Sequence, residues 1–138
     1  MASSIPRARR KDYADTLVAK ALKVAFFVNL TGYDPLTATT YAALAGTATE
    51  VSNAGTGYTT GGYSLTGLAS SNLATNGAIV TANASAVATA TFTAQYGVIY
   101  DSATGKIEGV SDWLVPYVVT NGTITVTWDA VAGIFNVQ

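Results

Sequence analysis

The stretch that says most about the fold is YVVTNGTITVTW, residues 117–128. Apolar and hydroxyl side chains alternate in its second half, which is the period of a strand with one covered face. Asn121 and Gly122 suit the two positive-φ positions of a type I′ turn, so the pattern predicts a hairpin between Tyr117–Thr120 and Thr123–Trp128. The residues expected to face inward are Ile124, Val126 and Trp128.

Short strand patterns, separated by Gly, Asn, Ser or Pro, recur through the rest of the chain. In Leu22–Val28, every second residue is expected to face the core, and the nearly uninterrupted apolar run Tyr96–Asp101 predicts a central strand covered on both faces. Further strands are expected at 49–52, 63–66, 78–82, 87–93, 106–110, 112–115 and 134–135. This spacing is typical of an antiparallel sandwich or barrel. We therefore predict an all-β fold, an antiparallel, jelly-roll-like β-sandwich.

Four segments are expected to lie outside the strands. The stretch from Asp15 can begin as a helix, and Asp34-Pro35 can cap a short helix that includes residues 41–44. Residues 53–62 hold four glycines, which predicts a flexible or partner-ordered loop, and Ser102–Gly105 is expected to close a hairpin.

Charge is scarce and segregated. Only 11% of the residues are charged, and residues 51–100 contain no Asp, Glu, Lys or Arg. All Lys and Arg residues except Lys106 lie before residue 24, whereas most of the acids follow it. We predict an extended basic N-terminal arm, residues 1–15, followed by one β-sandwich domain, residues 16–138. The uncharged middle is expected to be core and contact surface.

Catalytic chemistry has little support. The chain has neither Cys nor His, which removes the commonest general base, the usual nucleophile systems and nearly every zinc site. Asp101, Glu108 and Asp112 flank one predicted hairpin, and solvated, turn-flanking acids explain them better than a catalytic or calcium-binding pair. The glycine-rich loop lacks the spacing of a phosphate-binding motif. We expect no enzyme activity, no cofactor and no metal.

The basic cluster Arg7, Arg9, Arg10 and Lys11 is the predicted site. A solvated tail would explain it simply, but guanidinium groups that pair with carboxylates favour docking on an acidic protein surface. No basic stripe with interleaved aromatic residues continues into the body, so nucleic-acid binding is not expected. The longest apolar run, Val24–Val28, is too short to span a membrane.

The chain also resembles small virion structural proteins of tailed bacteriophages. The resemblance covers most of residues 20–137 and is carried by the order and spacing of LKVAF (22–26), GTGYTTGG (55–62), YGVIYD (96–101), NGTITVTWDA (121–130) and GIF (133–135). It implies a head decoration or cement protein, a small β-sandwich that binds as an oligomer over the joints between major capsid subunits.

The expected function is therefore that of a non-enzymatic cement protein on the outer surface of a tailed-phage head. Its expected partners are the major capsid protein and further copies of itself, as a dimer or trimer. Its expected location is the capsid exterior, after a period in the host cytoplasm. Two alternatives stay open: a tail or fibre subunit, and a carbohydrate-binding adhesin that uses Tyr and Trp on a sheet face.

Overall fold

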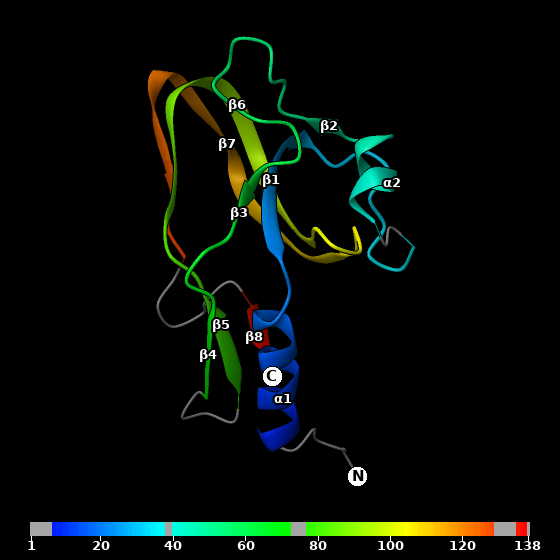
Figure 1. Ribbon diagram of the computed structural model, residues 1–138. Coiled ribbons are helices and arrows are strands. Elements are labelled where there is room, and N and C mark those ends of the chain that lie inside the picture. The colour runs from blue at the N-terminus through cyan, green and yellow to red at the C-terminus, as the bar shows by residue number, and fades with distance from the viewer. Residues whose placement is uncertain (1–6, 38–39, 73–76, 129–134, 138) are drawn as a thin grey trace. The chain divides into compact units, whose positions relative to one another are not determined.

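The computed structural model describes residues 7–37, 40–72, 77–128 and 135–137, with Arg7 and residues 135–137 described by their backbone alone (Figure 1). It is mostly antiparallel β-sheet, with 51% strand and 14% helix, which confirms the all-β prediction. The chain divides into two compact units. One comprises residues 1–20, 65–84 and 126–138, and the other comprises Ala21–Ser64 and Ser85–Thr125. The predicted division into an arm and a single domain stays a prediction.

The larger unit is built on one five-stranded sheet with the order β2-β1-β6-β7, in which β3 also pairs with β1. The strands are β1 (Leu22–Asn29), β2 (Thr49–Glu50), β3 (Tyr63–Ser64), β6 (Ser85–Asp101) and β7 (Ile107–Val126). β1 and β6 pair antiparallel from Leu22 opposite Asp101 to Phe27 opposite Tyr96. The predicted strands 87–93 and 96–101 are thus one long strand.

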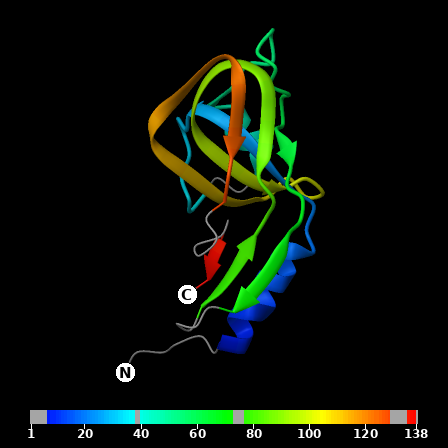
Figure 2. The ribbon, with the colours of Figure 1, turned by 90° about the vertical axis from the view of Figure 1, so that its left-hand side faces the viewer.

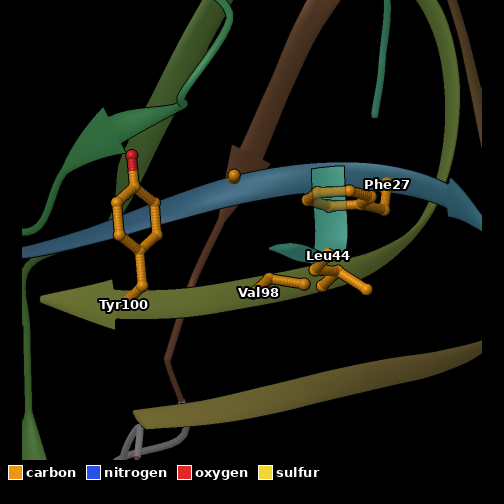
Figure 3. Packing of buried hydrophobic residues seen from close by; sticks show 5 residues of the cluster. Phe27, Leu44, Val98 and Tyr100 are labelled. Carbon is orange, nitrogen blue, oxygen red and sulfur yellow. The ribbon is translucent and has the colours of Figure 1, made fainter. Parts of the chain in front are cut away.

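β1 is covered on both faces, contrary to the prediction that only every second residue faces the core. Ala25 and Phe27, expected on the outer face, are fully buried. They pack with Leu44, Val98 and Tyr100 (Figure 3). Phe26, on the opposite face, packs against Tyr58, Tyr63, Phe92 and Trp113, with ring centroids 5.7–6.1 Å apart. A central strand with two apolar layers loses its alternation because both faces are core.

α2 (Tyr41–Ala45) supplies Leu44 to the first of these layers. The predicted short helix exists, but Thr40 caps it instead of Asp34. The Thr40 side chain accepts a hydrogen bond from the backbone N–H of Ala43, at 3.2 Å, as an N-cap requires. Asp34 instead accepts from Leu36 N–H and holds the preceding turn.

The hairpin between β6 and β7 turns at Ser102–Gly105, as predicted, and Gly105 takes the positive φ of 74° that closes it. Asp101 is not the solvated acid that the sequence indicated. It is 5% exposed and accepts hydrogen bonds from Ala103 N–H and the Thr104 hydroxyl, each at 3.0 Å. Both acceptor contacts close the turn, so this carboxylate has a structural role.

The predicted hairpin at Asn121-Gly122 is wrong. β7 continues through both residues, and only Asn121 has a positive φ (47°), whereas a type I′ turn needs two. The Asn121 N–H donates to the Thr91 hydroxyl on β6 at 2.8 Å, so this part of β7 is held by β6. Figure 2 shows the long ribbons of β6 and β7 curving strongly. Positive φ at Asn121, and at Leu114 (67°), bends the strand instead of ending it.

Of two further predictions for β7, the break at Pro116 is wrong and the alternation that follows is confirmed. Pro116 does not split the strand as expected, because the proline lies on the last strand of the sheet, where a missing N–H is tolerated. The alternation of inward and outward residues predicted for Thr123–Trp128 is confirmed. Ile124 is buried and Val126 and Trp128 are half-buried, whereas Thr123, Thr125 and Thr127 are exposed.

The smaller unit consists of a helix on a three-stranded sheet with the order β4-β5-β8. Its elements are α1 (Arg7–Val18), β4 (Ala69–Asn72), β5 (Ala78–Thr81) and β8 (Phe135–Val137). Ala14 and Leu17 on α1 pack against Ala78 and Val80 on β5. Residues 7–15 of the predicted extended arm are helical, because the helix continues N-terminally from this buried contact, and residues 1–6 of that arm lie outside the described residues. Ile134 of the predicted last strand lies outside the described residues.

Candidate functional site

The predicted docking residues lie together at the start of α1, but they do not form one exposed cluster. The Arg9 side chain is 76% exposed and pairs with Asp12 at 3.5 Å. Arg10 is half-buried, and its Nε is buried without a hydrogen-bond partner among the described residues. Arg7 begins the helix, and its side chain lies outside the description. Arg9 is thus the described arginine best placed to meet a partner.

Lys11 is held within its own unit. Its ammonium group donates to the Asp15 carboxylate, one turn along the helix, and to the Ser70 hydroxyl on β4 at 2.9 Å. The Ser70 hydroxyl also donates to Asp15. The hydrogen bond from Lys11, followed by that from Ser70, lowers the pKa of the Asp15 carboxyl. These contacts fasten α1 to the small sheet, so Lys11 has a structural role in addition to the predicted docking role.

The three acids near the β6–β7 hairpin do not converge. Asp101 is committed to the turn, and Asp112 accepts hydrogen bonds from Leu114 N–H at 2.8 Å and from the Gln95 amide at 3.3 Å. Among the described residues, no group of three or more Asp and Glu could hold a metal ion. No helix among the residues that the structure describes is long and apolar enough to cross a membrane.

The most concentrated set of polar contacts surrounds Glu50, which the sequence did not single out. Its Oε1 accepts hydrogen bonds from the Tyr58 hydroxyl at 2.6 Å and from Gly61 N–H at 2.8 Å, and its Oε2 accepts from the Tyr41 hydroxyl at 2.5 Å. The Tyr58 oxygen in turn accepts from the backbone N–H of Phe26 at 3.0 Å. One half-buried carboxylate thus joins β2, α2, β1 and the glycine-rich loop.

Tyr100 completes this group, which we call the Glu50 cluster (Glu50, Tyr41, Tyr58, Gly61 and Tyr100). Its hydroxyl donates to the Gly61 carbonyl at 2.6 Å, and its ring stacks on Tyr41 with centroids 4.5 Å apart and planes 12° apart. In Figure 3, Tyr100 stands on β6 beside Val98. Both backbone polar groups of Gly61 are therefore fixed by side chains from other elements.

The glycine-rich loop is anchored at several points. Apart from the contacts to the Glu50 cluster, the Tyr63 hydroxyl donates to the Gly57 carbonyl at 3.2 Å, and the Thr56 carbonyl accepts from Thr91 N–H at 2.9 Å. The prediction of a flexible or partner-ordered loop is therefore wrong for these anchored positions. The spacing of tyrosines within and beside the glycines was the available signal, since buried tyrosines need a hydrogen-bond partner.

The Glu50 cluster is expected to make the protein less stable at alkaline pH. Burial, and then hydrogen bonding to Glu50, raises the pKa values of Tyr58 and Tyr41, and burial followed by the charge of Glu50 raises that of Tyr100. The folded state therefore holds these phenolic protons more tightly than the unfolded state does. Their contribution is complete below the ordinary tyrosine value of about 10 and is lost as pH rises above it.

We expect the free energy of unfolding to fall above pH 10, by up to about 1.4 kcal/mol per pH unit from Tyr58 alone. Urea denaturation at pH 8, 10 and 11 measures this slope. Tyr58→Phe should reduce the slope, although it also lowers stability at pH 8. Tyr13→Phe, a change outside the cluster at a ring that is 51% exposed, is the control. Equal slopes for Tyr58→Phe and the parent protein would contradict the role given to this hydroxyl.

A second feature is an exposed apolar segment of β7, residues 114–118, which we call the apolar strip. Leu114, Val115, Tyr117 and Val118 are 82%, 60%, 58% and 71% exposed. Pro116 between them is also exposed. Exposed apolar residues scattered singly are normal, but a contiguous group on one strand usually marks an interaction site.

Comparison with known proteins leaves the class open. No family model, no curated protein and no solved structure matches this chain. Its geometry defines an antiparallel β protein with a cationic helix, a partly buried tyrosine–carboxylate cluster and an apolar strip on the last strand of a sheet.

Proposed function

We propose that this chain is a non-enzymatic structural protein of a tailed-phage virion that binds the outer surface of the head and stabilises contacts between major capsid subunits. The resemblance in sequence suggests this class. The observation that carries the docking mode is the segregation of charge, because Lys and Arg are concentrated on and near α1 whereas most acids lie elsewhere. A cationic helix favours an acidic surface, and a protein repeated over a shell gains from many weak contacts.

The finer parts of this proposal are a jelly-roll-like sandwich, self-association, and location on the capsid exterior. The abundance of antiparallel strand and the lack of charge in residues 51–100 support them. Density for intact particles that carry the protein would test all three together. Signal on the tail instead of the shell would favour the alternative of a tail or fibre subunit.

The geometry gives less support to a carbohydrate-binding adhesin. Sugar rings commonly bind on exposed, flat aromatic faces, whereas Trp113 packs edge-on against Phe26 in the core layer. The exposed ring of Tyr117 has its centroid 6.0 Å from that of Trp113 and lies at 84° to it. The two rings therefore do not form one flat platform.

The docking mode predicts a difference between two single-charge changes. Arg9→Gln, in the cationic part of α1, should weaken binding to particles that lack the protein, whereas Lys106→Gln, an exposed cation on the β6–β7 hairpin, should leave it unchanged. We expect a loss of up to about fivefold at physiological salt, since one exposed ion pair contributes about 0.2–1 kcal/mol. Cosedimentation with particles at several salt concentrations measures this loss.

Salt supplies a second readout. Screening of exposed charges should weaken binding of the parent protein as ionic strength rises, and Arg9→Gln should show the smaller dependence. Equal losses for Arg9→Gln and Lys106→Gln would show that net charge matters and the helix does not. Binding that is indifferent to salt and to both substitutions would overturn docking through α1.

A further inference from the structure

The apolar strip is exposed on both faces. Consecutive residues of a strand point to opposite faces, so Val115 and Tyr117 lie on one face and Pro116 and Val118 on the other. All four are exposed, and β7 is the last strand in the order of its sheet. Within the described residues, neither face of this segment is covered by the rest of its unit.

Leu114 has an unusual backbone for an exposed apolar residue. Its φ of 67° lies in the left-handed region, which disfavours residues with a Cβ, and its side chain is 82% exposed. The chain therefore bears a conformational cost at Leu114, and little intramolecular packing of the side chain offsets it. The Asp112 carboxylate holds this backbone by accepting from Leu114 N–H at 2.8 Å, and strained positions of this kind cluster at functional sites.

Charge indicates what covers the strip. Residues 113–128 carry no charge, and exposed Asp112 lies two residues before the strip begins at Leu114. The surface proposed for docking α1 is acidic, and it would repel Asp112 and gain nothing from neutral apolar side chains. The same strip on another copy of the chain is neutral and apolar, so it matches without like-charge contacts.

Charge also favours one relative direction of the two β7 strands in such a contact. If two copies of β7 ran parallel, their Asp112 carboxylates would lie together. If they run antiparallel about a two-fold axis near Tyr117, each Asp112 instead meets the uncharged residues after Thr120 of the other copy. Pro116 has no N–H to donate, so the two β7 edges meet through the side chains on both faces of the strip and not through a continuous backbone ladder.

We propose that the apolar strip is a homotypic interface: Leu114, Val115, Tyr117 and Val118 pack against the same residues of a second copy, with the two β7 strands antiparallel. This inference rests on the proposed function only where it assigns the acidic shell surface to α1. The interface forms between free molecules in solution and does not require the particle.

The first test measures the mass of the isolated protein against concentration by sedimentation equilibrium. The parent should shift from the 14.1 kDa monomer to a dimer. The double variant Leu114→Asn, Val118→Thr should weaken the dimer about tenfold or more, because it removes apolar contact at the centre of the interface. Asparagine accepts a positive φ and threonine preserves strand preference, so this variant should fold, as far-UV circular dichroism will verify.

The matched control is Leu36→Asn, which removes an exposed leucine of similar accessibility (89%) from a different segment. It should dimerise like the parent. A parent that stays monomeric at several hundred micromolar, or a dimer that survives the double variant, would overturn the proposal. If the double variant fails to fold, Val115→Thr alone supplies the same comparison with a smaller expected loss.

A second test determines how the two copies are oriented. Because the chain has no Cys, an introduced cysteine can link only to its counterpart in another copy. Tyr117→Cys, near the proposed two-fold axis, should form a disulfide-linked dimer under mild oxidation, whereas Leu36→Cys should not. Linkage of both variants to the same extent would indicate random collision and contradict the interface. A dimer that forms while α1 variants still bind particles normally would leave this inference standing and remove the proposed docking mode.

Discussion

Gly62→Ala is expected to lower the free energy of unfolding by about 3 kcal/mol or more, enough to threaten folding of a domain of ordinary stability. A Cβ built on Gly62 would lie 1.9 Å from the Val24 carbonyl oxygen and 2.5 Å from its carbon. Both atoms belong to the backbone of β1, which is held on its two sides by β3 and β6. β1 cannot move without breaking its pairing with β3 or β6, so the clash with the added Cβ cannot be relieved locally.

Gly55→Ala is the matched control. Gly55 has nearly the same φ (70° against 75°), but its Cβ would meet nothing within 4 Å. It should lose only about 1 kcal/mol, the cost of a side chain in the left-handed region. Urea denaturation of the two variants separates close approach from backbone preference. Equal losses would mean that the contact between the loop and β1 contributes little.

Glu50→Ala is expected to destabilise the protein by about 3 kcal/mol, because it removes one charged acceptor and leaves three donors without that hydrogen-bond partner. These donors are the hydroxyls of Tyr41 and Tyr58 and the N–H of Gly61. The loss should appear as a lower urea midpoint, with increased proteolysis within residues 53–62 as the loop loses its anchors.

Glu50→Gln tests whether charge or shape matters. An amide oxygen can still accept from Tyr58 and Gly61, so the loss should be about half that of Glu50→Ala. Asp12→Ala, which removes an acid paired at the surface with Arg9, should cost less than about 0.5 kcal/mol. A Glu50→Ala variant as stable as Asp12→Ala would show that the cluster does not anchor the loop.

The sequence was informative wherever neighbouring residues carry the signal. The positions of β1, the later half of β6 and the hairpin at Ser102–Gly105 followed from apolar runs and turn residues. The threonine alternation after residue 122 also held. These features depend on backbone preference and on the two-residue period of a strand, which operate over a few residues.

The same reasoning failed at Asn121-Gly122 because turn preference is only one of the competing terms. A hairpin there would pair residues that are adjacent in sequence, whereas the chain instead keeps β7 beside β6, thirty positions earlier at Thr91. Pairing with β6 retains the buried position of Ile124 and uses the positive φ of Asn121 as a bend. Tertiary packing thus overrode a strong local preference.

The candidate sites divide in the same way. The cationic residues before Asp12 were visible in the sequence, but only the structure separates exposed Arg9 from Lys11, which is bound to Asp15 and Ser70. Glu50 was visible only as the last acid before the uncharged run. Its three donors come from positions 41, 58 and 61, and no spacing rule joins them.

Composition and alternation thus establish an all-β chain with segregated charge, because strand preference and turn chemistry are local properties of the residues. The tertiary structure decides which strand partners β7, why both faces of β1 are buried, and which carboxylate holds the glycine-rich loop. It also decides that residues 114–118, no more apolar than β1, remain exposed. Burial depends on which elements meet in space, and that is set by the packing of the whole unit and not by any single segment.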